Sequence, residues 1–177
     1  MDIVEIIKKR RSIRQYIDRP IKGEAIKKLL EASISAPSGK NGQPWKFSVV
    51  NDPDEINRIA KLSLYYRWMR KANCFIIVYL DKGCSYHYIK DVQSCGAAIQ
   101  NILLAAHSMD IGSCWVGEFI EKGKEIKELL RIRNDDLEVM GVVTLGYSDK
   151  YSNTFERREL ESFMVKGAPE NHGTKLI

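Results

Sequence analysis

The stretch Ala36-Pro37-Ser38-Gly39-Lys40-Asn41-Gly42-Gln43-Pro44-Trp45 holds more than a connection between two elements needs. Its two prolines fix φ where they stand and its two glycines leave φ free, so the loop has a specified shape. Between Ser38 and Gln43 it also presents a hydroxyl, an ammonium and two carboxamides. A loop with both donors and acceptors suits a ligand with amide and carbonyl edges, and our hypothesis is that this ligand is a flavin.

Apolar periodicity predicts the elements on either side of this loop. Apolar residues at 26, 29, 30 and 34 predict an amphipathic helix over about 23–35, and 45–50 has the pattern of a strand. A near-continuous apolar run over 74–80 predicts a central strand buried on both faces. The remaining predictions are a first helix near 3–7 followed by an extended segment, helices from 53 and over 125–131, a short strand from 113 running into a glycine turn, and a last core strand over 139–147.

The longest predicted helix, 86–109, is apolar nearly all round in its middle and later parts. A helix of this kind is buried on most sides, so we expect it to pack against a second subunit as well as its own sheet. Gly112 is expected to end it as a C-cap. The polar segment after Tyr147 is too poor in apolar residues to fold alone, and we expect it to lie on another surface, such as that of a partner chain. We predict a single domain over 1–165 and a C-terminal tail over 166–177.

The composition is that of an ordinary globular domain, with 177 residues, 44% hydrophobic and 29% charged. The net charge of +5 is compatible with an anionic ligand or with nucleic acid and decides for neither. The four cysteines form no Cys-x-x-Cys pair and no zinc spacing, so we expect a reducing, cytoplasmic compartment and no metal site. The first residues lead straight into a helix and no run of about 18 apolar residues occurs, so we expect neither a signal peptide nor a membrane span.

Five positive charges lie between Lys8 and Arg14, after the first predicted helix. One interpretation is a solvated face that complements the helix C-terminus. The other is a phosphate site, because in an extended chain alternate residues point the same way and Arg10 and Arg14 would flank the hydroxyl of Ser12. The aromatic cluster at 65–68 has two interpretations as well, either internal packing or the border of a ligand site.

Several familiar catalytic patterns are missing from the sequence. It has no Gly-x-Gly-x-x-Gly after a strand, no P-loop and no Gly-x-Ser-x-Gly elbow. Its histidines are too few for a multi-histidine metal site, and the acid pair Asp135-Asp136 falls in a turn-like stretch. We therefore expect no catalytic side chain. Ligand-gripping loops without a catalytic acid, base or nucleophile are typical of proteins whose cofactor supplies the chemistry.

Four stretches in this order resemble the FMN-dependent nitroreductase family, over nearly the whole chain from about Ile3 to Phe163. Pro37–Trp45 is the most specific, because it matches Pro-Ser-x-x-Asn-x-Gln-Pro-Trp. The others are Arg10–Arg14, which matches Arg-x-Ser-x-Arg/Lys; Gln100–Ala106 with Ile111–Gly117, which match a buried central helix and its turn; and Arg157 with Leu160 and Glu161, which resemble a C-terminal basic element. The chain is shorter than many members and has Gly117-Glu118 where some have Glu-Gly. Both departures leave the substrate open.

The resemblance implies that several short segments hold FMN at a subunit interface. The basic side chains would hold the phosphate, with a serine and neighbouring backbone beside the ribityl chain and ring edge. The first residues of the loop would cover the flavin from the opposite subunit, and its carboxamides would bind the polar rim of the ring. The glycine turn would present backbone near the flavin N5 atom. The residues implied in these roles are Arg10, Arg11, Ser12, Arg14, Pro37, Ser38, Gly39, Asn41, Gln43, Val116, Gly117, Glu118 and Arg157.

The implied fold is α+β, a three-layer α/β/α arrangement with a mixed, mainly antiparallel sheet, assembled as an intertwined homodimer. The implied activity is a ping-pong reduction in which NAD(P)H passes hydride to flavin N5 and an electron-poor acceptor (a nitroaromatic, quinone, enone or flavin) is then reduced. Specialised flavin chemistry, such as dehalogenation, desaturation or fragmentation of the flavin, is one alternative. A basic nucleic-acid-binding protein is another, which the interleaved acidic residues disfavour. The choice between NADH and NADPH stays open.

Overall fold

The strands β1 (Trp45–Val50), β2 (Cys74–Asp81), β3 (Gly112–Val116) and β4 (Leu137–Gly146) form one sheet in the order β1-β2-β4-β3. The computed structural model describes residues 2–150 and 156–165. All three strand pairs are antiparallel, and a parallel bridge between Ser12 and Ser113 adds the N-terminal segment at the β3 edge. Among the described residues the four strands form an antiparallel sheet, so the prediction of a mainly antiparallel sheet is confirmed and its mixed character is not, because the parallel contact is a single bridge outside the strands.

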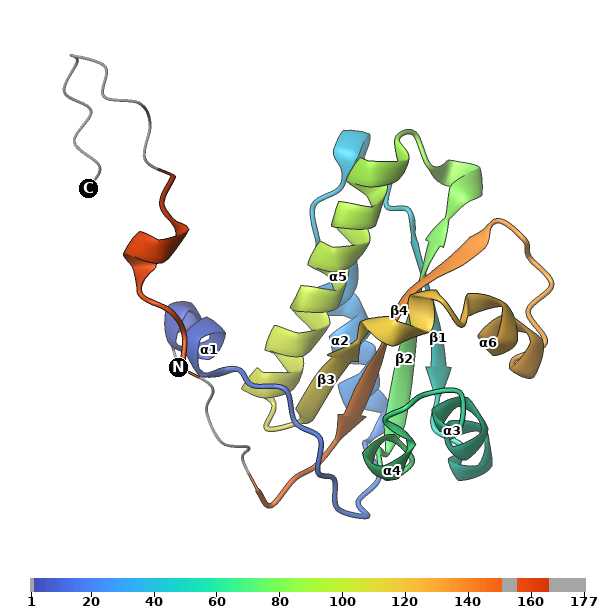
Figure 1. The fold of residues 1–177 in the computed structure, drawn as a ribbon, viewed down its shortest axis with the longest axis horizontal. Coiled ribbons are helices and arrows are strands. Elements are labelled where there is room, and N and C mark those ends of the chain that lie inside the picture. The colour runs from blue at the N-terminus through green and yellow to red at the C-terminus, as the bar shows by residue number, and fades with distance from the viewer. Residues whose placement is uncertain (1, 151–155, 166–177) are drawn as a thin grey trace.

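Helices cover both faces of this sheet, which confirms the three-layer prediction (Figure 1). On one face lie α2 (Gly23–Ile34) and α5 (Tyr88–Ser108), and on the other lie α3 (Pro53–Ala60), α4 (Tyr66–Met69) and α6 (Gly123–Leu129). Because β2 has a helix layer on each side, its residues from Cys74 to Leu80 are all buried. The unbroken apolar run in this strand follows from that position. Within the described residues, the remaining elements are the short 3-10 turns η1 (Gly39–Asn41), η2 (Lys82–Cys84), η3 (Gly117–Ile120) and η4 (Leu160–Phe163).

The end of α5 differs from the prediction that Gly112 caps it. The helix stops at Ser108, with Met109 as its C-cap, and Asp110 takes the left-handed conformation with φ of 56°. Gly112 instead opens β3, where an added Cβ would lie 2.8 Å from the side chain of Ile13. The glycine is thus explained by close packing of the N-terminal segment on the sheet edge rather than by the helix end.

Two segments lie apart from the three layers. Helix α1 (Ile3–Lys9) has no buried residue, and its neighbour in space is the segment that carries η4 (Figure 1). Ile3 is 59% exposed and Phe163 is 56% exposed. These apolar side chains agree with the expectation of a partner chain, which stays a prediction at this point. No helix in the described ranges, 2–150 and 156–165, is long and apolar enough to cross a membrane.

Candidate cofactor site

The N-terminal segment after α1 is extended and is fixed along the edge of the sheet. The amide of Ile13 donates a hydrogen bond of 2.9 Å to the carbonyl of Ser113, and the Ile13 side chain is buried. Since alternate residues of an extended segment face opposite ways, Ser12 and Arg14 point away from the side that buries Ile13. The predicted extended segment is therefore present, and β3 positions it.

A cluster of positive charges forms where this segment leaves α1. Burial lowers the pKa of the half-buried Arg10, and the nearby charges of Arg157 and Arg11 lower it further. Arg157 therefore lies within electrostatic reach of Arg10 although the two are far apart in sequence. In the part of the chain that the structure describes, Arg10, Arg14 and Arg157 form no ion pair with a carboxylate. An uncompensated set of guanidiniums is suited to an anion such as a phosphate.

The buried thiol of Cys114 lies within this cluster. Burial raises its pKa, while Arg14, Ser12 and Arg10 act in the opposite direction. His107 lies within electrostatic reach of Arg10: burial lowers the pKa of its imidazole, and the charge on Arg10 adds to that effect. The buried His107 Nε2 and Arg11 Nε atoms have no hydrogen-bond partner among the described residues. Unsatisfied polar atoms beside unpaired cations again indicate a place for a polar, anionic group.

The aromatic cluster at 65–68 lies near the same charges, and Tyr66 and Trp68 also pack on the hydrophobic core, so its role at a ligand site stays a prediction. The Arg14 guanidinium lies 5.9 Å from the centroid of the Trp68 ring. The Glu118 carboxylate accepts hydrogen bonds from the Ser63 hydroxyl at 2.5 Å and from the Leu64 amide at 3.2 Å. Sequence reasoning missed Ser63 and Leu64, because nothing in a serine–leucine pair signals a contact with a residue more than fifty positions away.

The turn after β3 leaves backbone accessible. Val116 is the last residue of β3, and Gly117 opens the turn η3. An added Cβ at Gly117 would meet nothing within 4 Å, so the glycine faces open space. The side chain of Glu118 is occupied by Ser63 and Leu64, which holds the turn in place. What the turn can offer a ligand is therefore its backbone.

The loop between α2 and β1 has a strained backbone. Lys40, Asn41 and Gln43 have φ of 53°, 55° and 47°, which non-glycine residues adopt uncommonly. The hydroxyl of Ser38 accepts from the Gln43 amide at 3.0 Å, and the carbonyl of Ser38 accepts from the Asn41 amide at 3.0 Å. The side-chain amide of Gln43 donates to the Asn41 carbonyl at 3.2 Å. Such strain typically marks a ligand or active site, where surrounding contacts keep the conformation in place.

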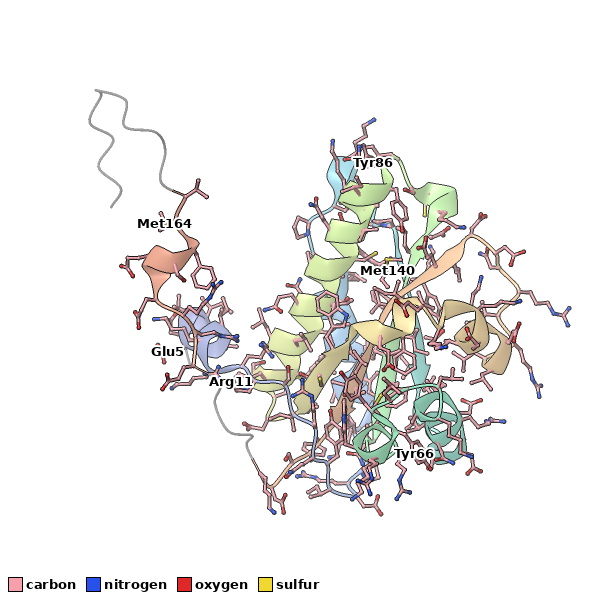
Figure 2. The ribbon with its side chains drawn as sticks, in the orientation of Figure 1. Glu5, Arg11, Tyr66, Tyr86, Met140 and Met164 are labelled. Atoms are coloured by element: carbon pink, nitrogen blue, oxygen red, sulfur yellow. The ribbon has the colours of Figure 1, made fainter. Side chains whose placement is uncertain are left out.

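The predicted site residues fall into two groups at opposite ends of α5. Arg10 and its neighbours lie at the C-terminal end, beside His107. The loop lies at the N-terminal end, where the ring of Tyr86 packs against Gly39. Figure 2 shows Arg11 and Tyr86 at the two ends of the helix. Since α5 has 21 residues, the groups are separated by roughly 30 Å. A single chain therefore does not bring them together.

The donors of the two groups indicate which kind of ligand each could hold. Within residues 2–150 and 156–165, no three or more histidine, cysteine, aspartate or glutamate side chains are placed to hold a metal ion. The two groups offer guanidiniums, carboxamides, hydroxyls and open backbone instead. Such a donor set fits an organic ligand that carries a phosphate and a polar ring.

Comparison with known proteins gives a family match over most of the chain. The model of the Nitroreductase family matches residues 7–65 and 61–147. A protein of Archaeoglobus fulgidus named "Putative NADH dehydrogenase/NAD(P)H nitroreductase" is 39% identical over 158 residues, which cover 88% of this chain and 90% of that protein. A Bacillus subtilis protein named "FMN reductase [NAD(P)H]" is 24% identical over 160 residues, covering 80% of this chain and 64% of that protein.

Solved structures give the same result for the fold. A "putative nitroreductase in complex with fmn" from Desulfovibrio desulfuricans superposes with a TM-score of 0.88 at 34% identity, covering 95% of this chain and 98% of that one. An "FMN-dependent Nitroreductase" from Clostridium difficile superposes with a TM-score of 0.79 at 28% identity, covering 92% and 97% of the two chains. The resemblance stated from the sequence and the α+β fold class are thereby confirmed.

Proposed function

The chain belongs to the nitroreductase family, and we propose that it works as a homodimer with two FMN sites, each built from both chains. It is an NAD(P)H-dependent FMN oxidoreductase. When bound, FMN supplies the redox chemistry, taking a hydride from NAD(P)H and passing electrons to a second substrate. The chain's own residues bind the cofactor, orient it and leave one of its faces open.

The observation that carries this proposal is the separation of the two residue groups along α5. Arg10 lies near one end of the helix and the loop around Asn41 lies at the other, roughly 30 Å away. Two chains packed with their α5 helices antiparallel would bring the loop of each chain to the arginine cluster (Arg10, Arg14 and Arg157) of the other. The exposed apolar residues of α1 and η4 would be covered by the same pairing.

The residues on each side have distinct tasks in this arrangement. The guanidiniums of Arg10, Arg14 and Arg157 would hold the phosphate, with Ser12 and the backbone of Arg11 beside the ribityl chain. From the partner chain, the carboxamides of the loop would bind the polar rim of the ring and its first residues would cover one side of it. The open backbone of the turn after β3 would face the edge of the flavin ring that carries the N5 atom. The loop residues concerned are Pro37, Ser38, Gly39, Asn41 and Gln43, and those of the turn are Val116, Gly117 and Glu118.

This division of the loop revises the sequence-based hypothesis, in which the loop served two sites. The hydrogen bonds between Ser38, Asn41 and Gln43 make the loop one compact unit. We therefore propose that the whole loop serves a single flavin, that of the partner's arginine cluster. A shared open face for NAD(P)H and for an electron-poor acceptor gives ping-pong kinetics, with nitroaromatics, quinones, enones and free flavins as the proposed acceptors.

The first test is direct. The purified protein should be yellow, release FMN on denaturation, consume NADH or NADPH anaerobically, and pass the electrons to one or more acceptors in a panel of nitroaromatics, quinones and enones. Parallel double-reciprocal lines would support the ping-pong scheme. A colourless protein with no affinity for FMN would overturn the proposal. Turnover of a halogenated or saturated substrate alone would favour the specialised alternatives instead.

A mixed dimer tests whether the site is shared. Arg10→Ala and Asn41→Ala chains, each deficient alone, are co-expressed with different tags and the mixed species is isolated. If each site takes Arg10 from one chain and Asn41 from the other, one site of the mixed dimer carries both changes and the other carries none. About half of the FMN should then return. If both residues serve FMN within one chain, every site carries one change and nothing is restored.

A further inference from the structure

Two lysine side chains flank the ring of Tyr86 just before α5. Lys40 Nζ lies 5.1 Å from the ring centroid and Lys90 Nζ lies 5.7 Å from it, both within the range of cation–π contacts. The tyrosine is 39% exposed. Among the described residues, neither lysine forms an ion pair. The result is an aromatic surface with two available positive charges.

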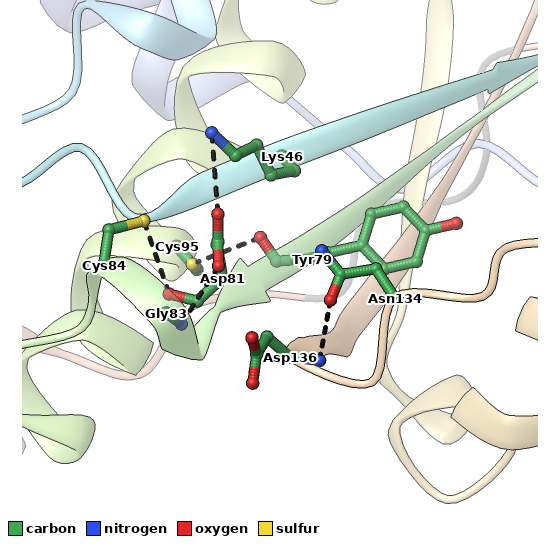
Figure 3. Close-up of polar contacts among 8 residues, drawn as sticks. All are labelled: Lys46, Tyr79, Asp81, Gly83, Cys84, Cys95, Asn134 and Asp136. Carbon is green, nitrogen blue, oxygen red and sulfur yellow. Dashed lines mark hydrogen bonds and ion pairs between the residues drawn. The ribbon is translucent and has the colours of Figure 1, made fainter.

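Hydrogen bonds to a buried carboxylate fix the turn that carries Tyr86. The carboxylate of Asp91, which is 1% exposed, accepts hydrogen bonds from the Ser85 hydroxyl at 2.7 Å and from the Tyr86 and His87 amides at 3.0 Å each. The preceding turn is held in the same manner, since the Asp81 carboxylate accepts from the Gly83 amide at 3.0 Å and pairs with Lys46 (Figure 3). The ring is thus presented by a fixed support rather than by a free loop.

Tyr86 also packs directly on the loop of the candidate site. A Cβ added at Gly39 would overlap the phenol ring, so the glycine is what allows this contact. Lys40 follows Gly39 in the loop that, under the proposed function, covers the partner's flavin. Under the proposed function, the lysine–tyrosine cluster would therefore lie next to the flavin of the partner's site, on the surface along which a hydride donor could extend.

We propose that Lys40, Tyr86 and Lys90 form a subsite for the phosphorylated adenylate half of NAD(P)H, an inference that rests on the proposed function. With its nicotinamide at the flavin, the rest of the dinucleotide must extend along the adjoining surface. Its negatively charged phosphates can pair with the two ammonium groups, and its adenine can stack on the face of the phenol ring. The phosphate concerned is either the diphosphate, which NADH and NADPH share, or the 2′-phosphate, which only NADPH carries.

The kinetic test uses the FMN-loaded protein with Lys40→Gln, Lys90→Gln and both changes together. Each single change should raise KM for the dinucleotide about fivefold, the upper end of what an exposed charge pair contributes. In Lys90→Gln the kcat and the FMN content should stay the same, because Lys90 lies on α5, outside the loop, and acts on a distant part of the donor. Lys124→Gln is the matched control, since Lys124 is an exposed lysine on α6 that pairs with Glu128 at 4.0 Å.

Calorimetric titration with ADP and with 2′,5′-ADP identifies the phosphate. A loss of affinity for both probes in the double variant assigns the lysines to the 5′-phosphates, and a loss for 2′,5′-ADP alone assigns them to the 2′-phosphate. Unchanged KM values and unchanged probe affinities in the double variant would overturn the inference while leaving the proposed function intact. Failure of the unaltered protein to bind FMN or to oxidise NAD(P)H would instead overturn the proposed function.

Discussion

The hydroxyl of Ser63 donates a hydrogen bond of 2.5 Å to the carboxylate of Glu118, which joins the segment between α3 and α4 to the turn after β3. The amide of Leu64 donates to the same carboxylate at 3.2 Å. Glu118 thus holds together the segment before α4 and the turn after β3. Because its side chain is used internally, the group that the turn would offer to the proposed cofactor is its backbone.

Removing this bond should loosen the turn without removing the cofactor. For Ser63→Ala, we expect the free energy of unfolding to fall by about 1–3 kcal/mol, since a charged carboxylate loses a buried partner. The rate of flavin reduction should fall while FMN still copurifies. Urea unfolding and stopped-flow absorbance would measure the two effects. Ser35→Ala is the control, because its hydroxyl makes an exposed bond of 3.0 Å to the Glu31 carbonyl. Equal effects in both variants would contradict the role given to Ser63.

A separate prediction concerns the affinity for FMN, which we expect to depend on the arginine cluster. Arg10→Ala should raise the Kd for FMN about tenfold to a hundredfold, because each charge-assisted hydrogen bond contributes about 1.5–3 kcal/mol. Folding should not suffer, since the change also removes repulsion from Arg157 and Arg11. Fluorescence titration of FMN measures the affinity. Arg58→Ala, at an exposed arginine paired with Glu55 at 3.8 Å, should leave it unchanged. An Arg10→Ala protein with normal flavin content would remove Arg10 from the site.

The sequence predicted the local features of this fold well, because they depend on neighbouring residues. The apolar run from Cys74 becomes β2 within one residue of its predicted end, and Ile13 marks an extended segment that the structure contains. Distances and contacts between residues far apart in the sequence could not be predicted in this way. The separation of Arg10 from Asn41 by the length of α5, and the bond between Ser63 and Glu118, depend on how the layers pack. Neither has a signature at the level of residue spacing.

The packing of Trp115 on Gly141 is another contact between distant residues. It predicts that a larger residue at position 141 lowers the free energy of unfolding. Gly141 has φ of 152°, and an added Cβ would lie 2.5 Å from Trp115 Nε1. Gly141→Ala should therefore displace the indole and lower the free energy of unfolding by about 1–3 kcal/mol. Tryptophan fluorescence and urea midpoints would report both changes. At Gly23 nothing lies within 4 Å of an added Cβ, so Gly23→Ala should be neutral or slightly stabilising. Similar midpoints for the two variants would contradict this account.

The lowered pKa of His107 predicts how the free energy of unfolding depends on pH. Burial lowers its pKa below the ordinary 6.5, and the charges of Arg10, Arg11 and Lys9 act in the same direction while Asp110 opposes them. The unfolded chain therefore binds a proton at this histidine more readily than the folded one. Stability from this group is present above about pH 6.5 and is lost as the pH falls toward the lower folded pKa.

His107→Gln should remove that part of the pH dependence, because glutamine has no proton to gain. The difference between the urea midpoints at pH 7.5 and at pH 5.5 should therefore be smaller in the variant than in the unaltered protein. Ser108→Ala, at the next and exposed position of α5, controls for any general disturbance of the helix end and should keep the original difference. A variant whose midpoint still falls by the full amount would show that acid destabilisation arises elsewhere. Because the charge of Arg10 acts on His107, protonation would also add a positive charge beside the proposed phosphate site, which links this part of the pH dependence to the arginine cluster.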